Sequence, residues 1–132
     1  MSKPLILVLK EEIENLKGKI LYENEEGSST EIYLNDNITN YNSMEITIKA
    51  TDTEKIIKID KPNSNKTFFE KLCYTLGNDL IEVFSKFAIY ENKISPINEN
   101  CGYYAISLFS GSLEMHFDRT NYIKITKVVG YK

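Results

Sequence analysis

The sequence predicts an all-β protein, an antiparallel β-sandwich or jelly-roll-like domain preceded by a short N-terminal α-helix. Three observations support this class. Turn-forming residues recur roughly every ten positions after residue 18, the segments between them alternate apolar and polar residues, and the one convincing helical pattern lies before residue 18. About eight or nine short strands at this spacing are typical of an antiparallel sandwich rather than of a βαβ fold.

The composition is that of one globular domain. The chain has 132 residues, 42% of them hydrophobic and 27% charged, so it is long enough to bury a core and is not disordered. The net charge is −3 and Arg119 is the only arginine, which argues against nucleic acid as a partner. No apolar run approaches the ~18 residues of a membrane span. The run "PLILVL" is too short for a signal peptide, so we expect synthesis in the cytoplasm.

Residues 1–18 are expected to form a helical segment used for oligomerisation or docking. Apolar residues recur there at three- and four-residue spacing, which places them on one stripe of a helix. These residues are Ile6, Leu9, Ile13 and Leu16. Gly18 is well placed to end the helix. Two interpretations of the stripe stay open: the helix packs on its own domain, or the stripe is a short coiled-coil seam with Ile at a and Leu at d.

Residues 19–132 are expected to form the β-sandwich domain, and its first half contains two hairpins. The runs "KILYEN" and "TEIYLN" are separated by a loop that contains Gly27. The segment "DNITNY" is typical of a turn, with one helical turn capped by Asp36 as the expectation. "SMEITIKAT" then alternates cleanly and is followed, after a tight turn, by "EKIIKID".

The second half continues the β pattern after the loop "KPNSNK". "TFFEKLCYTL" leads through a turn into residues 78–91, where aromatic and β-branched residues favour a strand. A helix remains the alternative there, because Asn78 could cap it. "CGYYAISLFSGSLEMHFD" predicts a hairpin with its turn at "SGS". The closing run "NYIKITKVVGYK" predicts an interior strand of the sandwich, with a bulge or two-sided cover near Val128–Val129.

The residues that carry chemistry show no catalytic pattern. Cys73 and Cys101 lie in apolar runs and are expected to be small buried residues; whether they pair stays open. His116 is the only histidine, and it has neither the context of a nucleophilic triad nor the companion ligands of a zinc site. No glycine-rich phosphate loop or calcium loop is present. We therefore expect no enzymatic activity, no cofactor and no bound metal.

Aromatic side chains are the remaining resource for binding. Tyr103 and Tyr104 are adjacent, so on a strand they point to opposite faces. An outward tyrosine can stack on a sugar ring or anchor a protein interface. The simpler interpretation, which stays open, is that it only covers a sheet face.

The order of these features resembles a known family. "ILYENEEGSSTEIYLNDNITNYNSMEITIKATD" is similar to the opening of a β-rich, receptor-binding-type domain of tail proteins from phages and prophages of Gram-positive bacteria. The ending "NYIKITKVVGYK" looks like the close of the same domain, so the resemblance spans residues 20–132. The chain departs from the family pattern in lacking tryptophan and in being acidic and very short, which leaves open whether it contacts a host receptor or is an assembly piece.

The resemblance implies a non-enzymatic structural or host-adhesion protein of a virion tail or tail-like particle. Such proteins form homo-oligomers, often trimers, through a helical N-terminus. Other tail proteins and cell-wall polysaccharide are the expected partners. Tyr103 and Tyr104, taken from the strand pattern above, are the candidates for a glycan platform. Two alternatives remain: a stand-alone carbohydrate-binding module and a small glycan-acting enzyme.

Overall fold

The structure, a computed structural model, describes residues 4–132 apart from the side chains of residues 14–16. The described elements follow one another in the order α1 (Leu5–Lys17), β1 (Lys19–Ser28), β2 (Ile32–Tyr33), η1 (Ile38–Asn40), β3 (Ser43–Ala50), β4 (Thr53–Asp60), β5 (Lys66–Leu76), β6 (Asp79–Ile89), β7 (Lys93–Pro96), η2 (Asn98–Asn100), β8 (Gly102–Ser107), β9 (Leu113–His116) and β10 (Lys124–Tyr131). The η elements are single turns of 3-10 helix.

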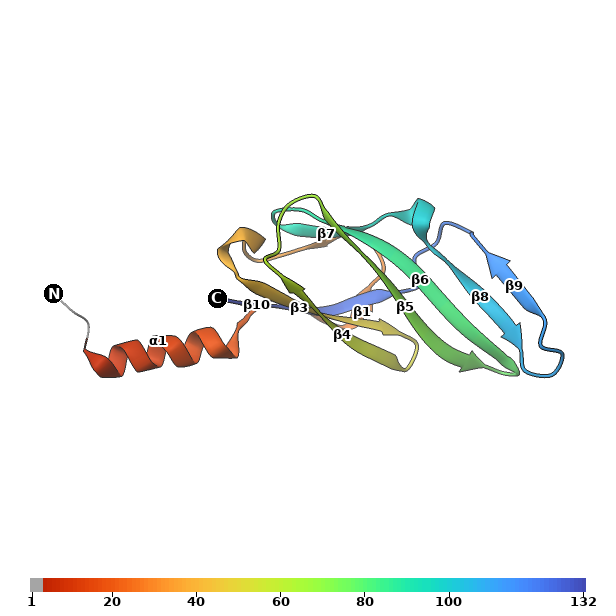
Figure 1. Cartoon of the computed structure of the whole chain (residues 1–132), viewed down its shortest axis with the longest axis horizontal. Coiled ribbons are helices and arrows are strands. Elements are labelled where there is room, and N and C mark those ends of the chain that lie inside the picture. The colour runs from red at the N-terminus through yellow and green to blue at the C-terminus, as the bar shows by residue number, and fades with distance from the viewer. Residues whose placement is uncertain (1–3) are drawn as a thin grey trace.

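The strands form two antiparallel sheets that face each other (Figure 1). The first has four strands in the order β1-β10-β3-β4. The second has six: β2-β7-β6-β8-β9 follow one another, and β5 pairs with β6 along its whole length. β6 is long enough for its Phe87–Ile89 end to pair with β7 and its Asp79–Phe84 end to pair with β8. The predicted all-β, sandwich-like fold with one N-terminal helix is confirmed.

The core lies between the two sheets and follows the predicted alternation. On β3, Met44, Ile46 and Ile48 are fully buried, while the residues between them are partly exposed. On β6, Val83 and Phe87 point to the same interlayer space and are 1% exposed. Residues 78–91 therefore form a strand over most of their length, and the helical alternative is wrong. Their β-branched and aromatic side chains fill a sheet face, which a helix would scatter around its axis.

The closing strand β10 is an interior strand, as predicted, because it pairs with β1 on one side and β3 on the other. An irregularity lies near the expected position: against β1, the register shifts between Ile20 and Tyr22, which pair with Val129 and Val128, so Leu21 of β1 is the extra residue there. A further irregularity was not expected. Against β3, the register shifts between Ile125 and Lys127, and the extra residue is Thr126. Thr126 is buried and donates its hydroxyl to the Thr47 carbonyl at 3.3 Å, which explains why a polar side chain is accommodated at the bulge.

The turn after β2 differs in one detail from the expectation. A single helical turn forms at η1, but Asn37 caps it by accepting a hydrogen bond from the Thr39 amide. Asp36 instead accepts from the Asn37 amide, the Asn40 amide nitrogen and the Tyr41 hydroxyl. Its carboxylate thus ties the turn together from outside the helical hydrogen-bonding pattern.

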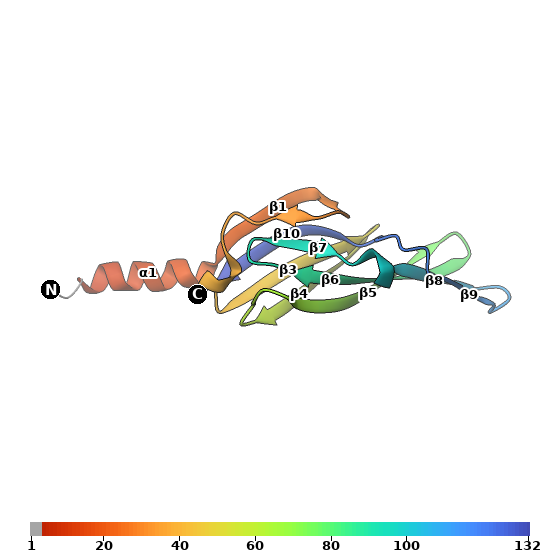
Figure 2. The ribbon, with the colours of Figure 1, turned by 90° about the horizontal axis from the view of Figure 1, so that it is seen from above.

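Helix α1 projects from one end of the β body, as both ribbon views show (Figures 1 and 2). Apart from Val8, which is half-buried, its described apolar side chains are exposed, so the interpretation that the helix packs on its own domain is wrong. The helix ends at Lys17, and Gly18 has a positive φ of 76°, as expected of the residue that ends it. No helix in the described chain is long and apolar enough to cross a membrane.

The two cysteines are free and have different environments. Cys101 is buried, as predicted. Cys73 is exposed on the outer face of β5, so the prediction of burial is wrong for this residue. Its thiol lies 3.3 Å from a carboxylate oxygen of Glu82, and burial together with this contact raises the pKa of the thiol.

Candidate functional site

The candidate site arises because the six-stranded sheet extends beyond the four-stranded sheet at the end away from α1 (Figures 1 and 2). There the inner face of β5, β6, β8 and β9 has no opposing strand to cover it. The result is a pocket of about 330 Å³. Its floor consists of Ile81 and Val83 from β6. This volume lies within the range of sites that bind small ligands.

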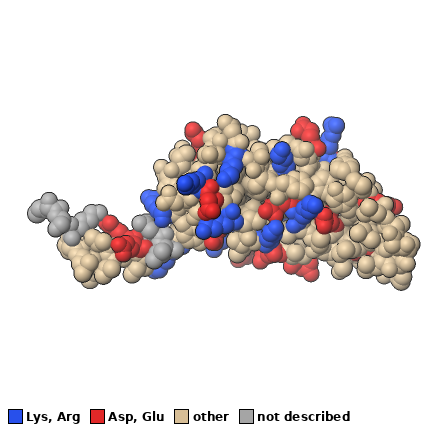
Figure 3. All heavy atoms as spheres, in the orientation of Figure 1, with Lys and Arg blue, Asp and Glu red and all other residues tan. Residues whose placement is uncertain are grey.

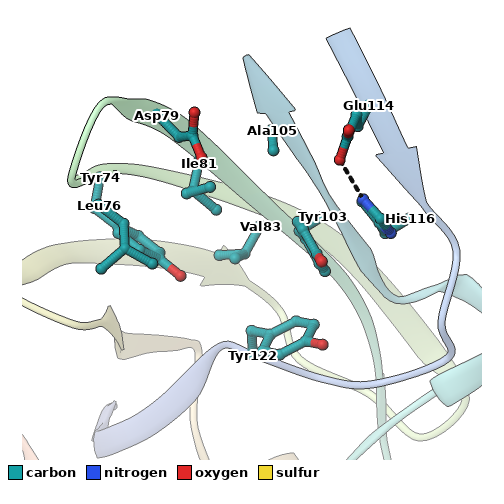
Figure 4. Close-up of a pocket in the computed structure, with 10 residues that line it drawn as sticks. All are labelled: Tyr74, Leu76, Asp79, Ile81, Val83, Tyr103, Ala105, Glu114, His116 and Tyr122. Carbon is teal, nitrogen blue, oxygen red and sulfur yellow. Dashed lines mark hydrogen bonds and ion pairs between the residues drawn. The ribbon is translucent and has the colours of Figure 1, made fainter. Parts of the chain in front are cut away.

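Aromatic side chains form the walls of this pocket (Figure 4). Tyr103 of β8 and His116 of β9 are directly paired across the two strands, and their rings stack at 4.5 Å and 12°. Tyr122, from the segment before β10, meets Tyr103 edge to face at 5.4 Å. Tyr74 of β5 stands on the other side of Val83 from Tyr103 (Figure 4). Three tyrosines and one histidine therefore surround an aliphatic floor.

A buried hydrogen-bond network holds Tyr122 at the pocket. Its neighbour Asn121 accepts from the Ser85 hydroxyl at 2.5 Å and from the Ile123 amide at 3.0 Å, and donates to the Ser29 carbonyl at 2.8 Å. Ser85 is fully buried and Asn121 is 8% exposed. Because each polar group here has a partner, the network fixes the chain before β10 on the inner face of β6.

Several polar groups lie in or beside the pocket. The Glu114 carboxylate lies 3.2 Å from His116 Nε2. The Tyr122 hydroxyl donates to the Asp118 carboxylate; this hydrogen bond, with burial and the charge of Asp118, raises the pKa of Tyr122 to about 12. The hydroxyls of Tyr74 and Tyr103 and the carboxylate of Asp79 form no hydrogen bond to any described residue. These groups remain available to a ligand.

This combination suits a polyhydroxylated ligand. Aromatic faces pack against the apolar C–H faces of a sugar ring. Unpaired hydroxyls and carboxylates in or beside the pocket can accept and donate hydrogen bonds to the hydroxyls of the sugar. Side chains that already hold one another in place need little reordering when a ligand binds, which favours affinity.

Of the two tyrosines singled out in the sequence, only Tyr103 lines this pocket. Tyr104 points to the opposite face of the sheet, where it packs on Phe84 at 5.0 Å and on Phe117 at 6.3 Å. Sequence reasoning missed Tyr74, Tyr122 and the two carboxylates. Tyr74 and Tyr103 have the same strand parity as buried residues, so alternation alone assigns them to the core.

The predicted oligomer interface lies at the other end of the molecule. Ile6, Leu9 and Ile13 are exposed by 63%, 47% and 51% of their surfaces. The side chain of Leu16 lies outside the described residues. The stripe is therefore uncovered wherever it is described, and the β body of the same chain supplies no cover for it.

A second hollow, of about 550 Å³, lies on the outer face of the four-stranded sheet. No aromatic residue lines it, and two of its lining residues, Lys127 and Glu23, form an ion pair with each other at 3.6 Å. In Figure 3, positive and negative side chains are mixed over the viewed face of the body, and no large patch of one charge is visible on that face. The aromatic pocket is therefore the better candidate for a ligand site.

Comparison of the chain with protein-family models, with curated proteins and with solved structures finds no match.

Proposed function

We propose that this protein is a non-enzymatic attachment protein of a phage or prophage tail or tail-like particle. In this proposal, helix α1 joins copies of the chain, and the pocket around Tyr103 binds a cell-wall saccharide. The observation that carries the proposal is the placement of an exposed apolar helix and an aromatic pocket at opposite ends of one β body (Figure 1). An attachment protein requires this separation, because one end assembles while the other stays free for its ligand.

A second copy of the chain is the proposed occupant of the α1 stripe. An exposed isoleucine or leucine gains about 1.5–3 kcal/mol when it is buried, and an isolated helix of this length is marginal in water. The same stripe on each copy is self-complementary, with Ile6 and Ile13 at a and Leu9 at d. Ile at a with Leu at d favours two strands, whereas the family resemblance implies three.

The assignment to a tail particle rests on the resemblance over residues 20–132, and other tail proteins are the corresponding partners. Assembly takes place in the bacterial cytoplasm in this proposal, and the assembled particle then carries the protein to the cell wall. The absence of a catalytic role is part of the same proposal.

Light scattering tests the assembly. The wild-type chain is expected to have the mass of a dimer or trimer, and the triple variant Ile6→Gln, Leu9→Gln, Ile13→Gln that of a monomer with an unchanged melting temperature of the β body. The matched control is Glu11→Gln, an exposed position off the stripe that lies at f when Ile6 is at a, so the variant should keep the oligomer. A wild-type monomer at high micromolar concentration would contradict the proposal.

Calorimetric titration with fragments of Gram-positive wall polysaccharide tests the pocket. Tyr103→Ala and Tyr122→Ala are each expected to weaken binding at least about tenfold, since burying a large apolar side chain contributes about 1.5–3 kcal/mol. Tyr33→Ala is the control, because Tyr33 is 65% exposed on β2 and lies outside the pocket. If the wild-type chain binds no wall polysaccharide, only the structural role remains.

A glycan-cleaving enzyme is the second candidate, because Asp79 and Glu114 both line the pocket and a glycoside hydrolase uses a pair of carboxylates. The contact of Glu114 with His116 Nε2, at 3.2 Å, occupies one of the two. Chromatography of the saccharide after prolonged incubation with the protein distinguishes the candidates. Intact saccharide supports binding alone, and cleavage that Asp79→Asn abolishes supports the enzyme.

A further inference from the structure

The pocket is lined by carboxylates and by no lysine or arginine. Asp79 at the start of β6 and Glu114 on β9 are the acidic residues of its lining, and none of the ten lining residues is lysine or arginine (Figure 4). Glu114 has His116 beside it at 3.2 Å. The Asp79 carboxylate has no hydrogen-bonding or ion-pair partner among the described residues. The pocket therefore contains one carboxylate without a protein partner.

The rings that enclose the pocket also favour positive charge. Tyr74, Tyr103 and Tyr122 stand on different sides of Val83 in Figure 4. The face of a phenol ring carries the negative part of its quadrupole, so several rings around one space attract an organic cation. Their contribution adds to that of the carboxylates, and no lysine or arginine of the lining opposes it.

We propose that the pocket selects a saccharide that carries a free ammonium group, such as an amino sugar. This inference rests on the proposed saccharide-binding function and specifies its ligand class. The sugar ring packs on the tyrosines, and its ammonium group donates hydrogen bonds to the Asp79 carboxylate.

The physical reason is the cost of covering a carboxylate. A neutral sugar that fills the pocket displaces water from Asp79, and its hydroxyl groups replace that water as hydrogen-bond donors without adding any positive charge. Charge-assisted hydrogen bonds are roughly twice as strong as neutral ones, and an ammonium group donates such bonds to the Asp79 carboxylate. The cationic sugar therefore gains binding free energy from its contact with Asp79, whereas the neutral sugar loses binding free energy there.

Two tetrasaccharides with the same backbone separate charge from shape: chitosan tetraose, which carries free amines, and its fully N-acetylated counterpart. Calorimetry at low salt and at a pH where the amines are protonated is expected to show about tenfold or tighter binding of the cationic form. Asp79→Asn should abolish this preference while the protein stays folded. The exposed Asp52→Asn, on the turn between β3 and β4, is the control.

The outcomes separate this inference from the function on which it rests. Equal or tighter binding of the N-acetylated form overturns the ammonium preference and leaves saccharide binding intact. Binding of neither form, with fragments of wall polysaccharide still bound, also overturns it. If Asp79→Asn fails to fold, Glu114→Gln takes its place, with a loss of at least about threefold for the cationic form alone expected. A cationic preference that neither variant reduces contradicts the role of these carboxylates.

Discussion

At the scale of single residues, the Asp36 carboxylate accepts three hydrogen bonds from its own turn. The Tyr41 hydroxyl donates to it at 2.7 Å, the Asn37 amide at 2.8 Å and the Asn40 side chain at 2.9 Å. Lys19 Nζ lies 3.6 Å away. The hydrogen bonds, that of Tyr41 first, lower the pKa of Asp36 from its ordinary value to about 2. The ionised carboxylate therefore stabilises the fold.

The stability of the protein should depend on pH through this residue. Because the pKa of Asp36 is lower in the folded than in the unfolded state, its contribution is complete above about pH 4 and is lost as the pH falls towards 2. Asp36→Asn should lower the melting temperature at pH 7, and the difference from wild type should shrink between pH 4 and pH 2. Thermal melts monitored by circular dichroism measure this.

The control for that series is Asp60→Asn, whose side chain is 78% exposed. It should change the melting temperature little at any pH, since exposed ion pairs contribute little. If the melting temperatures of wild type and Asp36→Asn differ by the same amount from pH 7 to pH 2, the charge of Asp36 does not stabilise the fold.

At the scale of elements, the junction of α1 with β1 determines how the helix leaves the body. Gly18 has φ 76° and ψ 171°, a combination that only glycine adopts without strain. A Cβ atom added there would lie 2.6 Å from Val129 Cγ1 and 2.7 Å from Tyr131 Cε1. The next residue, Lys19, already pairs with Gly130 of β10. The chain thus has little freedom to relieve a side chain at Gly18.

Gly18→Ala should therefore destabilise the protein by about 1–3 kcal/mol, as expected for a residue forced into a sparsely populated backbone conformation. The measurement is the free energy of unfolding from chemical denaturation. Gly111→Ala is the matched control: its φ is 69°, but a Cβ atom there meets nothing within 4 Å. If both variants lose the same free energy, the contacts with Val129 and Tyr131 do not restrict this junction.

Elements with regular alternation were predicted closely, and the details of turns were not. The period of two in β3 and the spacing of apolar residues in α1 depend on local sequence alone. The bulge at Thr126 depends on a partner distant in sequence, and the cap of η1 depends on which neighbouring side chains contact Asp36. Thr126 fits its bulge because of the Thr47 carbonyl on β3, and Asp36 gives up the capping position because Tyr41 and Asn40 engage it.

At the scale of the whole molecule, the proposed oligomer would place several pockets on one particle. A saccharide-coated surface could then bind two or more pockets at once, and the second binding event becomes intramolecular. Oligomerisation should not change the affinity of each pocket for a soluble saccharide, because α1 and the pocket lie at opposite ends of the folded molecule (Figures 1 and 2).

Breaking the oligomer should therefore reduce binding to surfaces only. The triple variant Ile6→Gln, Leu9→Gln, Ile13→Gln is expected to bind purified cell walls at least about tenfold more weakly than wild type. The two proteins should have equal affinity for a soluble fragment of the same polysaccharide. Sedimentation with walls and calorimetry with the fragment measure the two quantities. Equal wall binding by oligomer and monomer would remove multivalency from the proposed function.

The sequence by itself determined most of the strands, where the helix ends and which side chains share a face, because these depend on local periodicity and on residues such as Gly18. It did not determine strand pairing. The runs expected to form the first hairpin became β1 and β2, which lie in different sheets, and Gly27 lies within β1 instead of in a loop. Only the tertiary structure decided which of those faces are covered. Alternation gives Tyr103 the parity of the core residue Val83, but it does not report how far the opposing sheet extends. The four-stranded sheet stops short of β8 and β9, so a side chain with core parity lines a pocket instead. Likewise, the apolar stripe of α1 was evident in the sequence, and its exposure was not, because exposure depends on the direction in which the helix leaves the body.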